Sequence, residues 1–288
     1  MIAAMPGPVT LRPRGPYSLA ETCVFATDAT RHFRDGVLTS LVPGASGPEV
    51  ARARQLPDGA LEILAPSEAA LERLRFVLAV DDDHSEFVRR FRGDPLLGRT
   101  VTHLRGKRPL RTPTVAGALL RALCGQLIES KLARQLERTI VRATSEQHGE
   151  LRAPPTSASL GKLAPAKLRA LGLHARRGAT LVRLCDALDL ERLRDVPVER
   201  AAERLRRERG LGRWSVGVIA LTGLGSYRFG VAGDLGLLKL FAAVHGRWPD
   251  EGEDEQLLAP YGEWQGLASV YLLAGFSRGL IPLARAAA

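Results

Sequence analysis

The stretch Leu205-Arg206-Arg207-Glu208-Arg209-Gly210-Leu211-Gly212-Arg213-Trp214-Ser215 decides how this chain folds. Two helical segments flank the tight turn Gly210-Leu211-Gly212, whose glycines permit positive φ angles and close approach of the backbone. Such a turn leaves backbone N–H groups without hydrogen-bond partners. Unpaired N–H groups at the start of a helix form a binding site for a phosphate. Taken alone, the pattern also describes an ordinary helix C-cap. The residues downstream of the turn decide between these two interpretations.

A lone carboxylate, Asp234, follows in the run Val231–Leu237 and opens an apolar helical segment. An Asp in this position commonly caps its helix, and the helix dipole stabilises negative charge there. Combined with the turn, it predicts nucleic acid held by its backbone with an acidic residue directed at it.

Bulk composition is that of a soluble globular protein long enough for two domains: 288 residues, 45% of them hydrophobic and 25% charged. The net charge of +10 suits a polyanionic partner. Because nearly all the basic residues are Arg, codon bias explains that skew equally well. No stretch approaches a membrane span, and Met1–Pro8 lacks the layout of a signal peptide, so we expect a cytoplasmic protein. Three distant cysteines fit neither a disulfide framework nor a metal site and are expected to be buried free thiols: Cys23, Cys124 and Cys185.

The chain divides into two parts, and the fold class is predicted to be α+β. Over residues 1–100, the hairpin signals Asp35-Gly36 and Pro57-Asp58-Gly59 are flanked by β-compatible runs. Ser67 then caps a helix with an apolar face, so this part is expected to be a small antiparallel sheet with helices packed against it. The run Asp81-Asp82-Asp83 is read as a solvated turn at the helix end rather than a metal site.

Residues 101–288 are expected to be all-helical, with the hairpin at 205–215. One long apolar stripe runs from Val115 to Ile140, and shorter helices are predicted over 165–172, 175–188, 198–207 and 213–223. The strongly basic stretch Arg105–Pro113 joins the two parts. It is interpreted as a loop that contacts a nucleic-acid groove, with a plain solvated linker as the alternative.

The hairpin resembles the helix-hairpin-helix motif of the DNA glycosylase superfamily, with Arg209 in place of the usual proline at the turn entry. Gly233-Asp234-Leu235 is similar to the element that carries the superfamily's essential aspartate. The stretches Pro16-Tyr17, Leu123–Ile128 and Tyr261–Tyr271 resemble parts of 3-methyladenine DNA glycosylase II, so the resemblance covers nearly the whole chain.

This resemblance implies that Asp234 is catalytic, as a general base or as a charge that stabilises an oxocarbenium-like sugar. Gly210, Leu211, Gly212 and Arg213 are implied to hold a DNA phosphate. Bifunctional relatives carry a lysine where this chain has Trp214, and tryptophan cannot form a Schiff base. The expected reaction is therefore hydrolysis of an N-glycosidic bond that leaves the strand intact.

The target base must be rotated out of the duplex into a pocket. By resemblance, the pocket walls are Phe25, Gln126, Trp214, Val218, Leu235 and Phe276. Leu110 is the candidate for the side chain that fills the vacated space, with Leu104 as its competitor. Val218 and Leu235 stand where well-known relatives have aromatic residues, which puts the substrate range in doubt.

The sequence thus predicts a monomeric, monofunctional DNA glycosylase of base excision repair that acts on alkylated bases such as 3-methyladenine in double-stranded DNA. No cofactor is expected, and no metal except a monovalent cation that the resemblance permits at the hairpin. Two alternatives stay open: a DNA-binding protein without catalysis, and a glycosylase for another lesion such as a deaminated purine.

Overall fold

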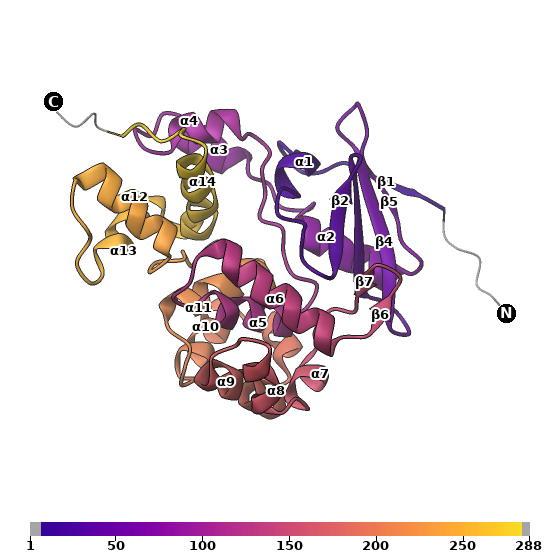
Figure 1. Ribbon diagram of the computed structural model, residues 1–288. Helices are drawn as coiled ribbons and strands as arrows, with labels where there is room; N and C mark the ends of the chain where they lie inside the picture. The colour runs from indigo at the N-terminus through magenta and orange to yellow at the C-terminus, as the bar shows by residue number, and fades with distance from the viewer. Residues whose placement is uncertain (1–6, 284–288) are drawn as a thin grey trace.

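A computed structural model describes residues 7–283, which form a small sheet domain beside a larger helical part (Figure 1). Most of the stretch on which the signal-peptide prediction depends, Met1–Pro6, lies outside the described residues. Within the described range no helix combines the length and the apolar character that crossing a bilayer requires.

The sheet has five antiparallel strands in the order β1-β5-β4-β3-β2. Both predicted hairpins are confirmed. Asp35 and Gly36 join β2 to β3 with φ angles of 51° and 77°, the left-handed pair that matches the twist of a two-residue hairpin. The strands are β1 Val9–Leu11, β2 Arg31–Arg34, β3 Val37–Pro43, β4 Pro48–Gln55 and β5 Leu61–Leu64.

Helices α1 (Leu19–Thr22) and α2 (Glu68–Leu78) cover one side of this sheet. As predicted, Ser67 caps α2, because its side chain accepts a hydrogen bond from the backbone of Ala70. The apolar side chains of α2 that recur at helical spacing are buried against β3 and β4: Leu71, Leu74, Val77 and Leu78.

The helical part consists of two lobes (Figure 1). In the first, α5 is buried almost all round and forms the centre. The predicted stripe from Val115 to Ile140 is wrong as a single helix, since α5 and α6 are separated by a turn around Leu127. The elements of this lobe are α5 Val115–Gly125, α6 Ser130–Thr144, β6 Gln147–His148, β7 Leu151–Arg152, α7 Ser157–Gly161, α8 Pro165–Ala170, α9 Ala175–Ala187, η1 Leu190–Arg194, α10 Val198–Arg206, α11 Arg213–Ile219 and η2 Ala220–Leu224.

The second lobe joins two early helices to the end of the chain. A Cβ on Gly275 of α14 would lie 2.1 Å from the Oγ1 of Thr100 in α4, so these helices touch closely. Phe87 and Phe91 also belong to the helical core, which therefore begins before residue 101. The elements are α3 Ser85–Phe91, α4 Gly98–His103, α12 Leu235–His245, α13 Glu253–Leu258, η3 Ala259–Trp264 and α14 Gln265–Ser277. The predicted α+β fold class is confirmed.

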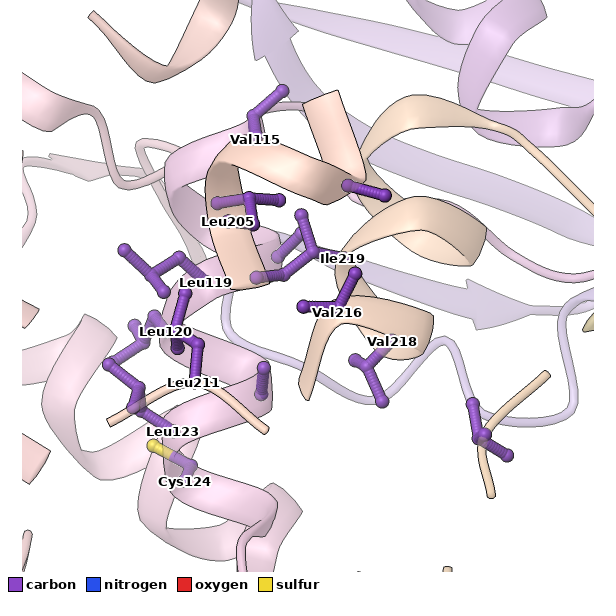
Figure 2. Close-up of a cluster of buried hydrophobic side chains, with 14 of the residues drawn as sticks. Val115, Leu119, Leu120, Leu123, Cys124, Leu205, Leu211, Val216, Val218 and Ile219 are labelled. Carbon is purple, nitrogen blue, oxygen red and sulfur yellow. The ribbon is translucent and has the colours of Figure 1, made fainter. Parts of the chain in front are cut away.

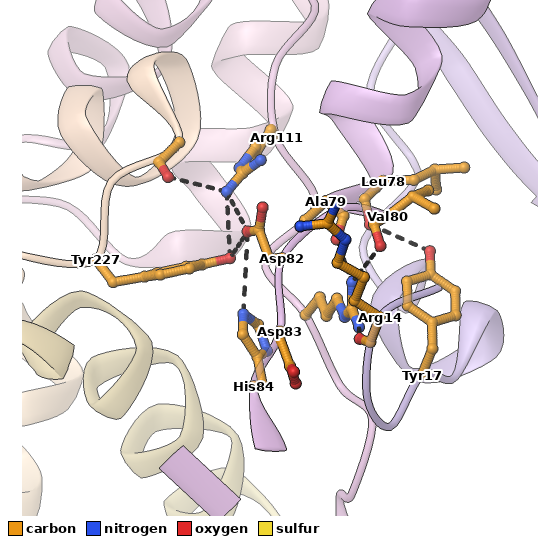
Figure 3. A network of polar contacts seen from close by, with 12 residues as sticks. Arg14, Tyr17, Leu78, Ala79, Val80, Asp82, Asp83, His84, Arg111 and Tyr227 are labelled. Carbon is orange, nitrogen blue, oxygen red and sulfur yellow. Dashed lines mark hydrogen bonds and ion pairs between the residues drawn. The ribbon is translucent and has the colours of Figure 1, made fainter. Parts of the chain in front are cut away.

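The basic stretch Arg105–Pro113 is mostly buried between the sheet domain and the helical part, so its prediction as a groove-contacting loop is wrong (Figure 3). Arg108 donates to the carbonyl oxygens of Ala79 and Val80 at the end of α2. Arg111 binds Asp82 and donates to the carbonyl of Gly225 at 2.9 Å. These arginines join the two parts of the molecule.

Leu110 and its competitor Leu104 are unsuited to the role predicted for them. The Leu110 side chain packs against the core of the sheet domain, and Leu104 is only 3% exposed in the helical core. Neither side chain can enter a DNA helix without unpacking a core.

Other predictions from the first half agree with the structure. Asp81 and Asp83 are exposed at the end of α2, as predicted, whereas Asp82 is half-buried and pairs with Arg111. The three cysteines are buried free thiols, and burial raises the pKa of Cys23 and of Cys185 to about 12.

Candidate active site

The hairpin turn presents its backbone to solvent while its central side chain is buried. Leu211 is 6% exposed and packs among leucines of α5 (Figure 2). Gly210 has a φ of 96°, and a Cβ there would lie 2.7 Å from the Oγ1 of Thr180 on α9. Gly212 is surrounded by open space. Within residues 7–283 the N–H groups of Gly210 and Gly212 find no hydrogen-bond acceptor, so they are free to bind an anion.

Asp234 lies at the N-terminus of α12, and both of its carboxylate oxygens have a donor. Its Oδ1 accepts a hydrogen bond from the backbone of Gly236 at 2.8 Å. Its Oδ2 accepts one from the indole Nε1 of Trp214 at 3.0 Å. The side chain is half-buried, and Trp214 is the second residue of the helix that leaves the turn. The carboxylate is thus held in one orientation beside the hairpin.

The absence of a side chain at Gly125 sets the position of the Trp214 ring. A Cβ on Gly125, the last residue of α5, would lie 2.6 Å from Cη2 of the indole. Carbon atoms do not approach so closely, so any side chain at this position displaces the ring. Gly125, Trp214 and Asp234 therefore form one packed series across three helices.

The loop that carries Asp234 is anchored at several points. Gly217 of α11 lies against the carbonyl oxygen of Gly230, which a Cβ would approach to 2.2 Å. The N–H of Val231 donates to Ser269 Oγ of α14 at 3.3 Å, and the N–H of Gly233 donates to a carboxylate oxygen of Asp254.

Gln126, which is predicted to line the pocket, makes two hydrogen bonds to the hairpin. Its Nε2 donates to the carbonyl oxygen of Gly210 and to Ser215 Oγ, both at 2.9 Å. The amide is therefore directed at the hairpin, and it ties the turn between α5 and α6 to the phosphate-binding turn.

The other predicted pocket residues come from four parts of the chain. Val218 is 8% exposed in α11, whereas Leu235 and Phe276 are half-buried. Leu235 directly follows Asp234, and Phe276 lies on α14, whose Leu273 contacts the position of Gly236. Phe25 is 56% exposed in the sheet domain, with the Arg134 guanidinium 4.7 Å above its ring. The roles of these four side chains in base binding stay predictions.

Leu127 is an exposed apolar residue of the candidate site that the sequence pattern did not predict. It is 96% exposed and has a φ of 56°, a strained conformation for a branched side chain. It directly follows Gln126, so it projects beside the hairpin. In the sequence it looked like one more leucine of an apolar stripe; the adjacent Gly125-Gln126 is the one local sign of a break.

The comparisons with known proteins agree with this geometry. No family model matches the chain. It is 25% identical over 207 residues to a DNA-3-methyladenine glycosylase from Bacillus subtilis, which covers 67% of each protein. A solved 3-methyladenine DNA glycosylase from Archaeoglobus fulgidus superposes with a TM-score of 0.81 at 18% identity, covering 93% of this chain and 98% of that one. An 8-oxoguanine glycosylase/lyase from Clostridium acetobutylicum, solved with double-stranded DNA, gives a TM-score of 0.75 at 15% identity, covering 96% and 99%.

The chain has the fold of the solved DNA glycosylases, with the hairpin and the aspartate at the start of α12 in place. In sequence it is similar to a DNA-3-methyladenine glycosylase.

Proposed function

We propose that this protein is a monofunctional DNA glycosylase that hydrolyses the N-glycosidic bond of alkylated bases, such as 3-methyladenine, in duplex DNA. The observation that carries this proposal is the hydrogen bond from Trp214 Nε1 to Asp234 Oδ2. It places a carboxylate beside a turn whose free N–H groups can hold the DNA backbone.

The hairpin is the element that binds the DNA backbone. The free N–H groups of Gly210 and Gly212, with the dipole of α11 behind them, bind a phosphate without reading base sequence. Binding should therefore be salt-sensitive and largely independent of sequence.

Asp234 supplies the charge that the reaction needs. As the base departs, positive charge develops on the deoxyribose, and a fixed carboxylate stabilises it as in glycoside hydrolysis. Because each carboxylate oxygen already accepts an N–H bond, the geometry favours this electrostatic role over abstraction of a proton from water.

Leu127 replaces Leu110 as the side chain that enters the duplex. Rotating a nucleotide out of the stack costs a few kcal/mol, and an apolar side chain that fills the gap offsets part of that cost. Leu127 is the large apolar residue that projects almost completely into solvent beside the hairpin. Leu127→Ala should lower the rate of excision from a stable base pair more than from a mispair, with little change in the melting temperature.

The absence of a lyase step follows from Trp214. Lys239 of α12, the helix that begins after Asp234, pairs with Glu129 at 3.6 Å. We therefore expect no covalent adduct when borohydride is added to the enzyme with lesion-containing DNA, and no strand break until alkali cleaves the abasic site.

The substrate class needs a direct test, because the solved relatives include enzymes for alkylated and for oxidised bases. Duplexes containing 3-methyladenine, 7-methylguanine, hypoxanthine or 8-oxoguanine are incubated with the protein, and the free base is quantified. Release of the methylated bases supports the proposal. Release of hypoxanthine or 8-oxoguanine alone assigns another lesion class, and tight binding with no release identifies a non-catalytic DNA-binding protein.

A further inference from the structure

Asp254 is a buried carboxylate for which neither the sequence pattern nor the proposed reaction gives a reason. It lies in the first turn of α13 and is 1% exposed, whereas its neighbour Glu255 has a side chain that is 54% exposed. A buried charge is strongly unfavourable unless charged or hydrogen-bonded partners offset its desolvation. The partners of Asp254 are therefore informative.

Those partners belong to the two halves of the candidate site. One oxygen accepts the N–H of Gly233, the residue directly before Asp234. The other lies 3.6 Å from a terminal nitrogen of Arg213, the residue directly after the hairpin turn. A single side chain thus contacts both the loop that carries the carboxylate and the helix that leaves the phosphate-binding turn.

We propose that Asp254 is a positioning residue that fixes the catalytic loop relative to the hairpin. The inference rests on the proposed roles of Asp234 and of the hairpin; Asp254 itself touches neither the sugar nor the base. It provides a second link between hairpin and loop, parallel to the direct bond from Trp214 to Asp234.

The backbone at Gly233 explains why such a link is needed. Gly233 is exposed, has a φ of 87° and has no side chain whose packing could hold the peptide in place. Without an acceptor for its N–H, this peptide can rotate, and Asp234 moves with it. A misplacement of roughly 1 Å at a reacting group can lower a rate about 100-fold.

The test uses Asp254→Ala, Asp254→Asn and a matched control, Glu255→Ala. The control removes an ion pair to the same arginine, Glu255 to Arg213 at 2.6 Å, without touching Gly233. For each variant we would measure the single-turnover rate constant on the best lesion duplex, the Kd for DNA with an abasic-site analogue, and the melting temperature.

We expect Asp254→Ala to lower the rate constant at least about tenfold with less than a threefold change in Kd. Asp254→Asn should recover most of the rate, because its amide oxygen can still accept the N–H of Gly233. Glu255→Ala should behave as wild type. A wild-type rate in folded Asp254→Ala, or an equal loss in Glu255→Ala, overturns the proposal.

A second measurement does not depend on turnover. Hydrogen exchange of the Gly233 amide, followed by NMR, should accelerate in Asp254→Ala and stay slow in Asp254→Asn and Glu255→Ala. Unchanged exchange in Asp254→Ala rejects the inference even if the protein excises no base. If Asp254→Ala does not fold, Asp254→Glu replaces it: the extra methylene shifts the acceptor, so the rate constant should fall while DNA affinity persists, and a wild-type rate refutes the proposal.

Discussion

Replacing Trp214 by phenylalanine removes one hydrogen bond from the site and leaves an aromatic ring in place. The lost bond runs from the indole Nε1 to Asp234 Oδ2 at 3.0 Å. A hydrogen bond to a charged group contributes about 1.5–3 kcal/mol, and about 1.4 kcal/mol corresponds to a tenfold change in rate. If the bond orients the carboxylate at the transition state, the single-turnover rate constant should fall between about 10-fold and 150-fold.

The assay compares that rate constant with the Kd for duplex DNA carrying an abasic-site analogue. The hairpin backbone is unchanged by the substitution, so the Kd should stay within a few-fold of wild type. Trp248→Phe is the matched control, because it makes the same chemical change at an exposed side chain outside the site. A wild-type rate in Trp214→Phe would show that the bond has no part in holding Asp234, and a rate loss explained entirely by weaker DNA binding would contradict the reasoning equally.

Three further predictions concern the same scaffold. Gly125→Ala places a Cβ 2.6 Å from the Trp214 ring, so the rate constant should fall as in Trp214→Phe, and a wild-type rate would contradict the packed series. Arg111→Met leaves the Asp82 carboxylate without its cation between the sheet domain and the helices, which should lower the free energy of unfolding by about 3 kcal/mol in a urea titration; an unchanged midpoint would show that this ion pair is not stabilising. Burial lowers the pKa of His84 to about 3. Between pH 6.5 and pH 3 this histidine is therefore protonated in the unfolded chain and neutral in the folded protein. Stability should therefore fall by up to about 1.4 kcal/mol per pH unit between pH 6.5 and pH 3, and less steeply in His84→Phe.

The hairpin and Asp234 could be recognised from sequence because their chemistry is local. A glycine-rich turn, an N-cap and an apolar helical period are each encoded within a few residues. The same is true of the β2–β3 turn at Asp35-Gly36 and of the cap at Ser67, and the structure confirms both.

The wrong predictions concern side chains whose partners lie far away in the chain. Arg108 and Arg111 look like residues of a nucleic-acid loop, yet their acceptors are carbonyl groups and a carboxylate near residue 80 and at Gly225. Leu110 lies between the two arginines in sequence and is half-buried against the core of the sheet domain for the same reason. Charge and hydrophobicity at one position do not say which surface will cover it.

Two residues of the candidate site were missed for related reasons. Leu127 fits a helical apolar period, and its left-handed backbone conformation shows that the helix has already ended. Asp254 lies in the acidic run 250–255, and such a run is typical of a solvated surface. The packing of α13 buries this one carboxylate and leaves Glu255 exposed.

The most direct test of the central claim is Asp234→Asn. The amide keeps the size of the carboxylate but removes its negative charge. That charge is proposed to stabilise the positive charge that develops on the deoxyribose as the base departs. We expect the variant to bind lesion-containing duplex as tightly as wild type and to release no measurable free base in a single turnover. Base release at the wild-type rate by Asp234→Asn, with DNA binding intact, would contradict the account.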